Sequence, residues 1–473
     1  MILLILLFSL ILRLISLNQS LWLDEGINVL AVKNYSLSFL LTDYLKADFH
    51  PPLFFIFLWG WTKIFGYSEI AVRVPSVVFG VLAVYIIYLI GKKLVNQKLG
   101  FIAALILGIN PLHIYYSQEA RMYALAALAV SLNLFYFIKL VRGEKKSFSL
   151  GYFLSSLLIL GSDYLAYFIF PAQLMYLIFL RSKITFKIWV LSFLPSLLFF
   201  VFWLPFIFKQ LNVGTNAVSN IPKWGEVVGS FGSKPVILTF VKFIIGRIDY
   251  PDKIIYALIF LPIGIFFIFL IATAFIKSSK FVRNLLVTLL VLPIVSVSLV
   301  SFFIPVYSYF RLLYLVVPFI LLVSLGLIFF KNRLFKILLT AVVVIELGSS
   351  LIYLFNPLFQ RENWRGAVEF IKKTPATRIV LLESDGIFSP YEYYANGSIN
   401  TIPALKKFPA NSKADVVDLN EKLKGENEVL LMDYLVDISD SNRQVKKKLQ
   451  EVGFSPGEIY NFNGVGFIYK YHR

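Results

Sequence analysis

Two adjacent acidic residues near the start of the chain, Asp24 and Glu25, are the first whose types could do chemistry. They follow the apolar residues Trp22 and Leu23, which predicts that the Asp24 carboxyl group is partly removed from water. Desolvation raises the pKa of a carboxylic acid toward the range in which its carboxylate takes a proton from an attacking hydroxyl group. The second acid, Glu25, is suited to act beside this base as a hydrogen-bonding or metal-binding group. The alternative, an ordinary polar pair at the end of an apolar segment, stays open from these residues alone.

Three more candidates stand together in the stretch Gln118-Glu119-Ala120-Arg121. Ionisable residues at the edge of apolar segments tend to face a cavity or to pair with one another. On the same side as Asp24, these residues would bind substrate: Glu119 an acceptor or a divalent metal, and Arg121 a phosphate group. The alternative is a local ion pair between Glu119 and Arg121 that stabilises a helical hairpin.

Arg311 and His50 complete the candidate site. Arg311 stands at the boundary of an apolar segment, where a guanidinium group can hold a phosphate through two parallel hydrogen bonds or can reach lipid headgroups. His50 precedes Pro51 and Pro52, a setting more typical of a structural cap than of a ligand. With carboxylates nearby it can also bind substrate or a metal, so Glu119 and His50 are the two candidate metal ligands.

The elements that must position these residues are helices in a membrane. The chain has 473 residues, 58% of them hydrophobic, and a mean hydropathy of +0.77. A soluble protein of this composition would have too few polar residues to cover its surface, so we predict an all-α polytopic membrane domain. The run Met1–Leu17 lacks a basic start and a small-residue cleavage site and is therefore predicted to be a retained span. Cysteine is absent, which excludes thiolate chemistry.

The net charge of +18 does not indicate nucleic-acid binding. Residues 355–473 hold 16 basic and 15 acidic residues, so nearly all of the excess belongs to the membrane part. There the basic residues separate apolar runs and form no single patch, so no nucleic-acid partner is expected. Membrane lipids are the expected surroundings.

Short basic clusters set the predicted topology. Five clusters carry fifteen Lys or Arg residues and one acid, Glu144, and the positive-inside rule places all five in the cytoplasm. They are Lys92–Lys98, Arg142–Lys146, Arg181–Lys187, Lys277–Arg283 and Lys331–Lys336. About eleven spans then fit, with the N-terminus cytoplasmic and the C-terminal part extracytoplasmic, in the cell membrane. The predicted spans are Met1–Leu17, Pro75–Gly91, Leu99–Tyr116, Met122–Val141, Leu150–Gly161, Tyr164–Leu180, Ile188–Phe208, Ile254–Ile276, Asn284–Ile304, Leu312–Phe330 and Ile337–Leu354.

Two outer segments connect these spans. Residues 18–74 form a long first loop, in which the apolar stretch Pro51–Phe65 is predicted to lie on the membrane surface as an interfacial helix. A second loop is predicted for Lys209–Lys253 because Gly, Asn and Pro are frequent there. Inside the last span Glu346 is an unexplained acid, and Arg13 of the first span is its candidate partner.

Residues 355–473 change character and predict a soluble α/β domain, which sets the domain boundary after residue 354. Helical spacing covers Trp364–Lys373 and Asn442–Val452. Strands are predicted at Arg378–Glu383, Glu428–Asp433, Glu458–Phe462 and Gly466–Tyr471. This part has no glycine-rich phosphate loop, so an accessory role is expected for it.

Four motifs in order carry a family resemblance: LWLDEG, FHPPLFF, SEIAVRVPSVVFG and NPLHIYYSQEARMYAL. Together they resemble the membrane glycosyltransferases of the dolichyl-phosphate-mannose-protein mannosyltransferase type, which are glycosyltransferase family 39 and its relatives, including the aminoarabinose transferases. The match covers about Leu21–Leu140 and weakens toward Arg311. Glu119 stands where a second Asp could be expected, which leaves the use of a metal open.

The resemblance implies a C-type glycosyltransferase fold whose first outer loop carries the catalytic acid. The implied donor is a sugar joined through phosphate to a polyprenol, and the implied acceptor is a hydroxyl group on a protein, lipid or polysaccharide. Asp24 would be the general base of an inverting transfer, and Arg311, or else Arg121, would stabilise the departing phosphate. No cofactor is certain, and a divalent metal remains open.

Two other classes compete with this hypothesis. A lipid or small-solute transporter or flippase typically places charges at the midplane of the bilayer and often shows inverted repeats, and neither is visible here. A non-catalytic scaffold would use the α/β domain to bind a partner. Deleting residues 355–473 without loss of sugar transfer would argue against the scaffold.

Overall fold

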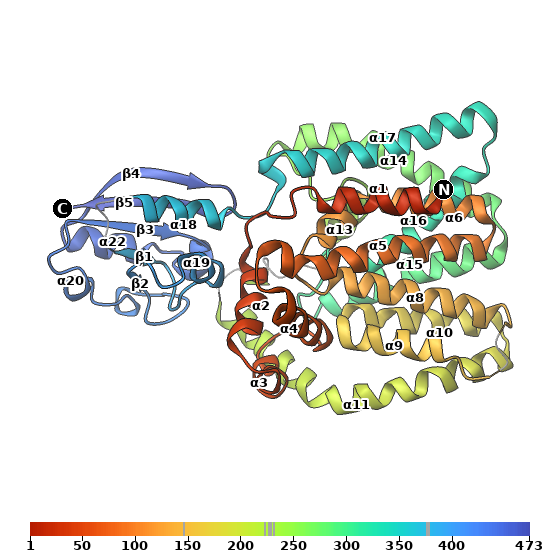
Figure 1. The fold of residues 1–473 in the computed structure, drawn as a ribbon, viewed down its shortest axis with the longest axis horizontal. Coiled ribbons are helices and arrows are strands. Elements are labelled where there is room, and N and C mark those ends of the chain that lie inside the picture. Colours follow the sequence, from red (N-terminus) through yellow and green to blue (C-terminus); the bar gives the residue numbers. More distant parts are fainter. Residues whose placement is uncertain (145–146, 222–223, 226–228, 230–231, 375–378) are drawn as a thin grey trace. The chain divides into compact units, whose positions relative to one another are not determined.

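The structure is a computed structural model that describes residues 1–144, 147–221, 224–225, 229, 232–374 and 379–473 (Figure 1). The chain forms two compact units. The first consists of Met1–Leu17, Ser36–Leu211 and Val228–Phe359, and the second of Asn18–Tyr35, Asn212–Val227 and Gln360–Arg473. The predicted basic residues Lys145 and Lys146 and the strand start at Arg378 lie outside the described residues.

The first unit is helical. Its described helices are α1 (Ile2–Leu14), α3 (Leu37–Thr42), α4 (Leu53–Phe65), α5 (Glu69–Leu94), α6 (Gln97–Ile109), α7 (Pro111–Ser117), α8 (Tyr123–Val141), α9 (Leu150–Ser162), α10 (Ile169–Leu180), α11 (Lys183–Asn220, which continues into the second unit), α13 (Ser233–Ile245), α14 (Lys253–Lys277), α15 (Lys280–Ser301), α16 (Val316–Ile328) and α17 (Asn332–Phe355).

Six of these helices, α5, α8, α11, α14, α15 and α17, are long and apolar enough to cross a membrane. The bent pair α6–α7 makes a seventh if it counts as one span. The prediction of a multi-pass membrane protein is therefore confirmed. The other four predicted spans coincide with shorter apolar helices, Ile2–Leu14, Leu150–Ser162, Leu165–Leu180 and Leu313–Ile328, so the number eleven stays a prediction.

A break between α6 and α7 places the candidate residues that follow them. The two helices meet at 61°, at Asn110 and Pro111. Proline disfavours a helical conformation of the residue before it, and the Asn110 side chain accepts a hydrogen bond from the His113 backbone N–H, which starts the new helix. Helix α7 then ends at Ser117, directly before Gln118.

Arg13 of α1 supports this break. Its guanidinium group donates to the Gly108 carbonyl oxygen at the end of α6 (2.9 Å) and contacts His113 Nδ1 (2.7 Å). Glu346 of α17 accepts a hydrogen bond from the Asn110 side chain (2.7 Å). The expected pairing of Arg13 with Glu346 was therefore wrong: the buried guanidinium group donates to helix-end carbonyls, and the amide of Asn110 donates to one oxygen of the buried carboxyl group.

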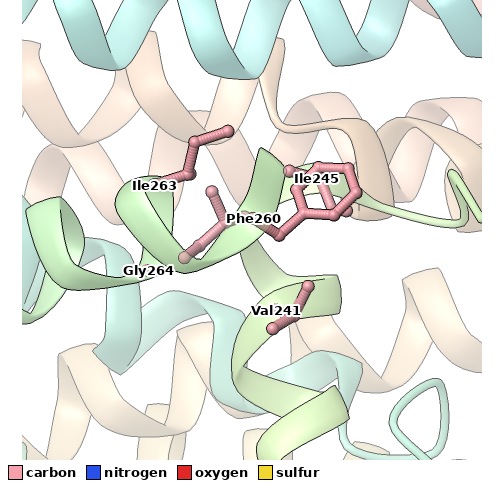
Figure 2. A pocket seen from close by; sticks show the side chains of 6 residues that line it. Val241, Ile245, Phe260, Ile263 and Gly264 are labelled. Atoms are coloured by element: carbon pink, nitrogen blue, oxygen red, sulfur yellow. The ribbon is translucent and has the colours of Figure 1, made fainter. Parts of the chain in front are cut away.

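The predicted loop Lys209–Lys253 was also wrong in part. Helix α11 runs on to Asn220, and α13 forms at Ser233–Ile245. Gly246, at φ +67°, ends α13, because glycine adopts this left-handed conformation without strain. Figure 2 shows a hollow lined by α13 and α14 side chains, including Val241 and Phe260. The hollow is wholly apolar and too tight for water, so it contributes packing rather than chemistry.

The second unit contains a five-stranded sheet with the order β2-β1-β3-β5-β4. Strands β1 and β2 and strands β1 and β3 pair parallel, whereas β5 pairs antiparallel with β3 and β4. The described elements are α2 (Leu23–Asn34), α18 (Trp364–Lys373), β1 (Val380–Leu382), α19 (Ser389–Ala395), β2 (Thr401–Pro403), α20 (Leu419–Lys422), β3 (Glu428–Asp433), α21 (Val436–Ser439), α22 (Gln444–Glu451), β4 (Ser455–Phe462) and β5 (Gly466–His472). The α/β prediction holds, and the short β2 was missed.

Alternating side chains place one hydrophobic core on each face of this sheet. Leu381 and Leu431 pack with Leu449 of α22 on one face. Val380 and Leu382 pack with Trp364 of α18 on the other. Because both faces are covered, β1 and residues 429–432 of β3 are continuous apolar runs, as is usual for parallel strands between helices.

Candidate functional site

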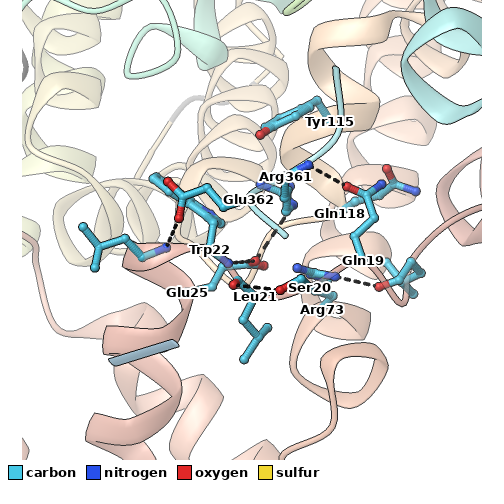
Figure 3. A network of polar contacts seen from close by, with 12 residues as sticks. Gln19, Ser20, Leu21, Trp22, Glu25, Arg73, Tyr115, Gln118, Arg361 and Glu362 are labelled. Carbon is cyan, nitrogen blue, oxygen red and sulfur yellow. Dashed lines mark hydrogen bonds and ion pairs between the residues drawn. The ribbon is translucent and has the colours of Figure 1, made fainter. Parts of the chain in front are cut away.

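Helix α2 carries the predicted catalytic acids in its first turn, and the two carboxyl groups have different surroundings. Glu25 is fully buried: its Oε2 accepts the Trp22 backbone N–H (3.5 Å) and lies 3.9 Å from the Arg361 Nε (Figure 3). Asp24 is half-buried. The more accessible acid is the one suited to meet a substrate, and the buried acid is suited to hold the helix.

A further acid, Glu362, stands beside this turn. Its Oε2 accepts hydrogen bonds from the Leu23 backbone N–H (3.1 Å) and the Trp364 indole N–H (2.7 Å), and its Oε1 accepts from the Tyr434 hydroxyl (3.0 Å). Burial raises the pKa of Glu362, and the charge of Asp24 raises it further, against the effect of these hydrogen bonds. The pKa of Glu362 is therefore closer to neutral pH than the pKa of an ordinary glutamate.

In the first unit, His50 links two charged residues. Its Nδ1 lies 2.7 Å from Asp48 Oδ1, and its Nε2 lies 3.1 Å from Arg121 Nη2. Since a guanidinium group only donates, Nε2 accepts, and Nδ1 carries the proton that is donated to Asp48. Burial opposes ionisation of Asp48, but the hydrogen bond from His50 and the charge of Arg121 hold the pKa of its carboxyl group below the ordinary value. The predicted residues His50 and Arg121 thus come together.

Asp163 brings Arg311 into the same region. This buried acid follows α9 and accepts the Leu165 backbone N–H (2.8 Å). Burial raises the pKa of Asp163, while the backbone hydrogen bond from Leu165 and the charge of Arg311 act in the opposite direction. Arg311 itself donates to the Val306 carbonyl oxygen (3.0 Å). Arg121 and Arg311, two of the cations predicted from sequence, therefore act on neighbouring groups: Arg121 on His50, and Arg311 on Asp163.

The loop that carries His50 is fixed by a polar chain from two helical segments. The Gln210 side chain donates to the Leu45 carbonyl oxygen (2.5 Å) and accepts from the Tyr164 hydroxyl (2.5 Å). The Trp203 indole N–H donates to the same hydroxyl (2.8 Å). These contacts attach the turn before His50 to α11.

Glu119 lies fully buried in the turn between α7 and α8, close enough for its charge to act on Arg247. The Arg247 guanidinium group donates to the Tyr115 hydroxyl (2.7 Å) and lies 4.7 Å from the centre of that ring. Burial alone would lower the pKa of Arg247, but Tyr115, Tyr309 and Glu119 hold it well above the ordinary value. Arg247 is thus a fixed, fully charged cation.

Gln118 has a different place. It donates to the carbonyl oxygens of Arg13 (3.0 Å) and Ile15 (2.6 Å) at the end of α1, and it accepts from the Tyr353 hydroxyl of α17 (2.7 Å). These contacts tie together the ends of three helices. Its described contacts therefore fit positioning better than direct binding of a substrate.

Four residues of these clusters were missed by sequence reasoning. Asp48 was recognisable two positions before His50, and Asp163 as a lone acid between two apolar runs. Arg247 sits in a stretch interpreted as loop. Glu362 gave no signal, because its partners Leu23 and Tyr434 are far from it in sequence.

The candidate metal ligands were tested against this geometry. Both ring nitrogens of His50 face partners, Asp48 and Arg121. Among the described residues, no group of three or more His, Cys, Asp or Glu side chains is arranged to hold a metal ion. The two ring nitrogens of His50 are thus engaged by protein groups and are not arranged for a resident metal.

Residues 49–207 match the family model described as dolichyl-phosphate-mannose-protein mannosyltransferase. This segment contains His50, Gln118, Glu119 and Arg121. The resemblance predicted from the motifs is confirmed. Among curated protein sequences, none matches the chain significantly.

Solved structures support the same assignment of fold. ArnT from Cupriavidus metallidurans in the apo state is similar with a TM-score of 0.58 at 12% identity, over 99% of this chain and 97% of that chain. The same protein bound to undecaprenyl phosphate matches with a TM-score of 0.57 at 11% identity, with the same coverage. The archaeal oligosaccharyltransferase AglB from Archaeoglobus fulgidus, in complex with an inhibitory peptide and a dolichol-phosphate, matches with a TM-score of 0.52 at 12% identity, over 99% of this chain and 74% of that chain. The chain thus shares its fold with these membrane proteins, and its residues 49–207 match the family model.

Proposed function

We propose that this protein transfers a sugar from a polyprenyl-phosphate donor to an acceptor hydroxyl group, with inversion at the anomeric carbon, on the extracytoplasmic side of the cell membrane. The observation that carries the proposal is the fold match along nearly the whole chain to ArnT bound to undecaprenyl phosphate. The family match, which covers His50 to Arg121, supports the same reaction class. The N-terminus would be cytoplasmic and the α/β domain extracytoplasmic.

Asp24 is the proposed general base. Its carboxylate takes the proton of the acceptor hydroxyl while the acceptor oxygen forms a bond to the anomeric carbon. The bond between that carbon and the phosphate oxygen breaks, and its electron pair leaves with polyprenyl phosphate. Asp24 suits this role because it is the accessible member of the acidic pair, whereas Glu25 is held inside by Trp22 and Arg361.

Arginine side chains are the proposed stabilisers of the leaving phosphate. A cation that is already in place lowers the energy of the developing charge without reorganisation. Arg311 and Arg121 were the sequence candidates, and both belong to the cluster around His50. Arg247 adds a third fixed cation, oriented by Tyr115. His50, Glu119 and Gln118 complete the proposed substrate-binding set, with Gln118 acting through the helix ends it joins.

Purified protein in lipid nanodiscs, incubated with a panel of polyprenyl-phosphate sugars and candidate acceptors, tests the proposal. Released polyprenyl phosphate and a glycosylated acceptor are the expected products. Asp24→Asn should lower the rate by about 10²–10⁴-fold, as expected for loss of a general base, while lipid binding persists. Asp437→Asn, a change at a side chain that is 75% exposed, is the matched control. Movement of the lipid across proteoliposomes without any transfer product would instead establish a flippase.

A further inference from the structure

The segment that carries the proposed base and the C-terminal α/β domain form one compact unit, although more than 300 residues separate them along the chain. Residues 18–35 and 360–473 cluster together. The sequence suggested an accessory role for the α/β domain. The contacts inside this unit indicate a role in catalysis.

Residues 360–365 form hydrogen bonds with residues 18–20, the segment that precedes α2. The Gln19 side chain accepts the Arg361 backbone N–H (3.2 Å), and the Ser20 hydroxyl accepts the Arg365 backbone N–H (3.0 Å). The Arg365 guanidinium group donates to the Asn18 carbonyl oxygen (2.8 Å). Each of these bonds joins a side chain of one segment to a backbone group of the other, so the two segments are held together along their backbones as well as by their side chains.

The body of the α/β domain also holds α2. The Leu21 backbone N–H donates to the Tyr394 hydroxyl of α19 (2.8 Å). Helices α2 and α19 approach so closely at Gly26 that an added Cβ would lie 2.7 Å from the Pro390 nitrogen. Leu23 itself packs against the core on the α18 face of the sheet.

Glu362 is the central contact, because it reaches the first residue of α2. The first N–H groups of a helix have no partner within the helix, and a negative charge beside them is favourable. Glu362 supplies both an acceptor and a charge to Leu23, the residue before Asp24. Trp364 from α18 and Tyr434 beyond β3 fix the glutamate from the domain side.

We infer that the C-terminal domain positions the catalytic base, with Glu362 as the positioning residue that fixes the first turn of α2 and thereby the Asp24 carboxylate. This inference rests on the proposed function of Asp24. It assigns Glu362 no contact with the substrate: Glu362 acts through Leu23. The domain is accordingly part of the catalytic machinery.

Titration of Glu362 gives this role a distinctive signature. Its ionised form accepts from Leu23, Trp364 and Tyr434, and a proton on the carboxyl group removes one of these acceptor positions. The other titratable or charged groups around it are Asp24 of α2, Tyr434 of the domain and the neighbouring Arg361–Glu25 pair. Because the pKa of Glu362 is raised, acidification should weaken the support of α2 at a higher pH than for an ordinary glutamate.

The variants Glu362→Gln, Glu362→Ala and Glu362→Asp in the full-length protein test the inference. Glu369→Gln, at an exposed position on α18, the helix that follows Glu362, is the control. For Glu362→Gln we expect kcat to fall by about tenfold or more while KM for the lipid donor changes little, since misplacement of a catalytic group lowers kcat. The acid limb of the pH–rate profile should move, and Glu362→Asp should restore part of the rate.

Hydrogen–deuterium exchange gives a readout besides activity. The peptide covering residues 18–35 should exchange faster in Glu362→Gln and Glu362→Ala than in the wild type, with the peptides of β3 and β5 unchanged. Wild-type exchange in this peptide together with an unchanged pH–rate profile would overturn the inference. If the wild type releases no polyprenyl phosphate, the proposed function fails, while the exchange result still shows whether Glu362 holds α2.

Discussion

Nδ1 of His50 lies 2.7 Å from Oδ1 of Asp48, while Nε2 of the same ring accepts a hydrogen bond from Arg121. The imidazole therefore joins a half-buried anion, Asp48, to a buried cation, Arg121, and each contact restricts the position of the ring. The contact with His50 helps to fix the direction of the Arg121 guanidinium group. This is the arrangement expected for a cation that must meet a second anion, such as a phosphate group.

Removal of this link gives the first prediction. His50→Ala should lower kcat/KM for the lipid donor by about 10²-fold, because a misplaced catalytic group loses roughly this much. His50→Gln, which retains a donor and an acceptor, should lose less. Initial rates of polyprenyl phosphate release at several donor concentrations make the comparison. Equal rates for His50→Ala and wild type would show that the position of Arg121 does not depend on its contact with His50.

Arg247 gives the second prediction. A hydrogen bond to a charged group contributes about 1.5–3 kcal/mol, which corresponds to about 10–100-fold in affinity or rate. Arg247→Gln should weaken donor use by this factor, and Arg247→Lys should recover only part because ammonium lacks the planar fork. Arg283→Gln, an exposed arginine at the start of α15, is the control. Binding of polyprenyl phosphate, measured by microscale thermophoresis, separates an affinity effect from a rate effect.

The close approach of α2 and α19 gives the third prediction. Gly26→Ala would place a methyl group 2.7–3.0 Å from backbone and ring atoms of Pro390. Overpacking of this kind costs about 1–3 kcal/mol, so sugar transfer and the thermal stability of the second unit should both fall. Gly60→Ala in α4 is the matched control, since no atom lies within 4 Å of its added Cβ. Differential scanning fluorimetry and the transfer assay report the two effects, and equal losses in both variants would contradict the packing argument.

A buried acid in the α/β domain gives the fourth prediction, on pH dependence. Burial and the neighbouring charge of Asp433 hold the pKa of Glu383 well above its ordinary value, with Lys446 opposing. A folded state that keeps this carboxyl group neutral gains stability below the unfolded pKa of about 4.3 and loses it as pH rises toward the folded value. The domain should therefore be more stable at pH 5 than at pH 8. Glu383→Gln should flatten this dependence in melting curves between these values, and an unchanged slope would contradict the assignment.

The helical spans, the strands β1 and β3 and the amphipathic α18 could be predicted from sequence because each is set by local hydrophobic spacing. Helix α13 was missed because Thr239 and Lys242 interrupt its apolar run and glycines stand on both sides. The acidic pair could be found from its neighbours Trp22 and Leu23. The difference between the surroundings of the two carboxyl groups could not be predicted. It depends on Arg361 and Glu362, which come close to α2 only when distant segments of the chain fold together.

The discontinuous second unit affects how an active molecule can be made. A ribosome completes residues 18–35 long before it reaches Glu362, so the helix with the proposed base is synthesised before the partners that fix its first turn. A chain that is truncated before the last domain would keep Asp24 yet lack a defined position for it. If Asp24 is the base, incomplete copies inserted in the membrane would therefore be inactive, and only full-length synthesis would complete the site.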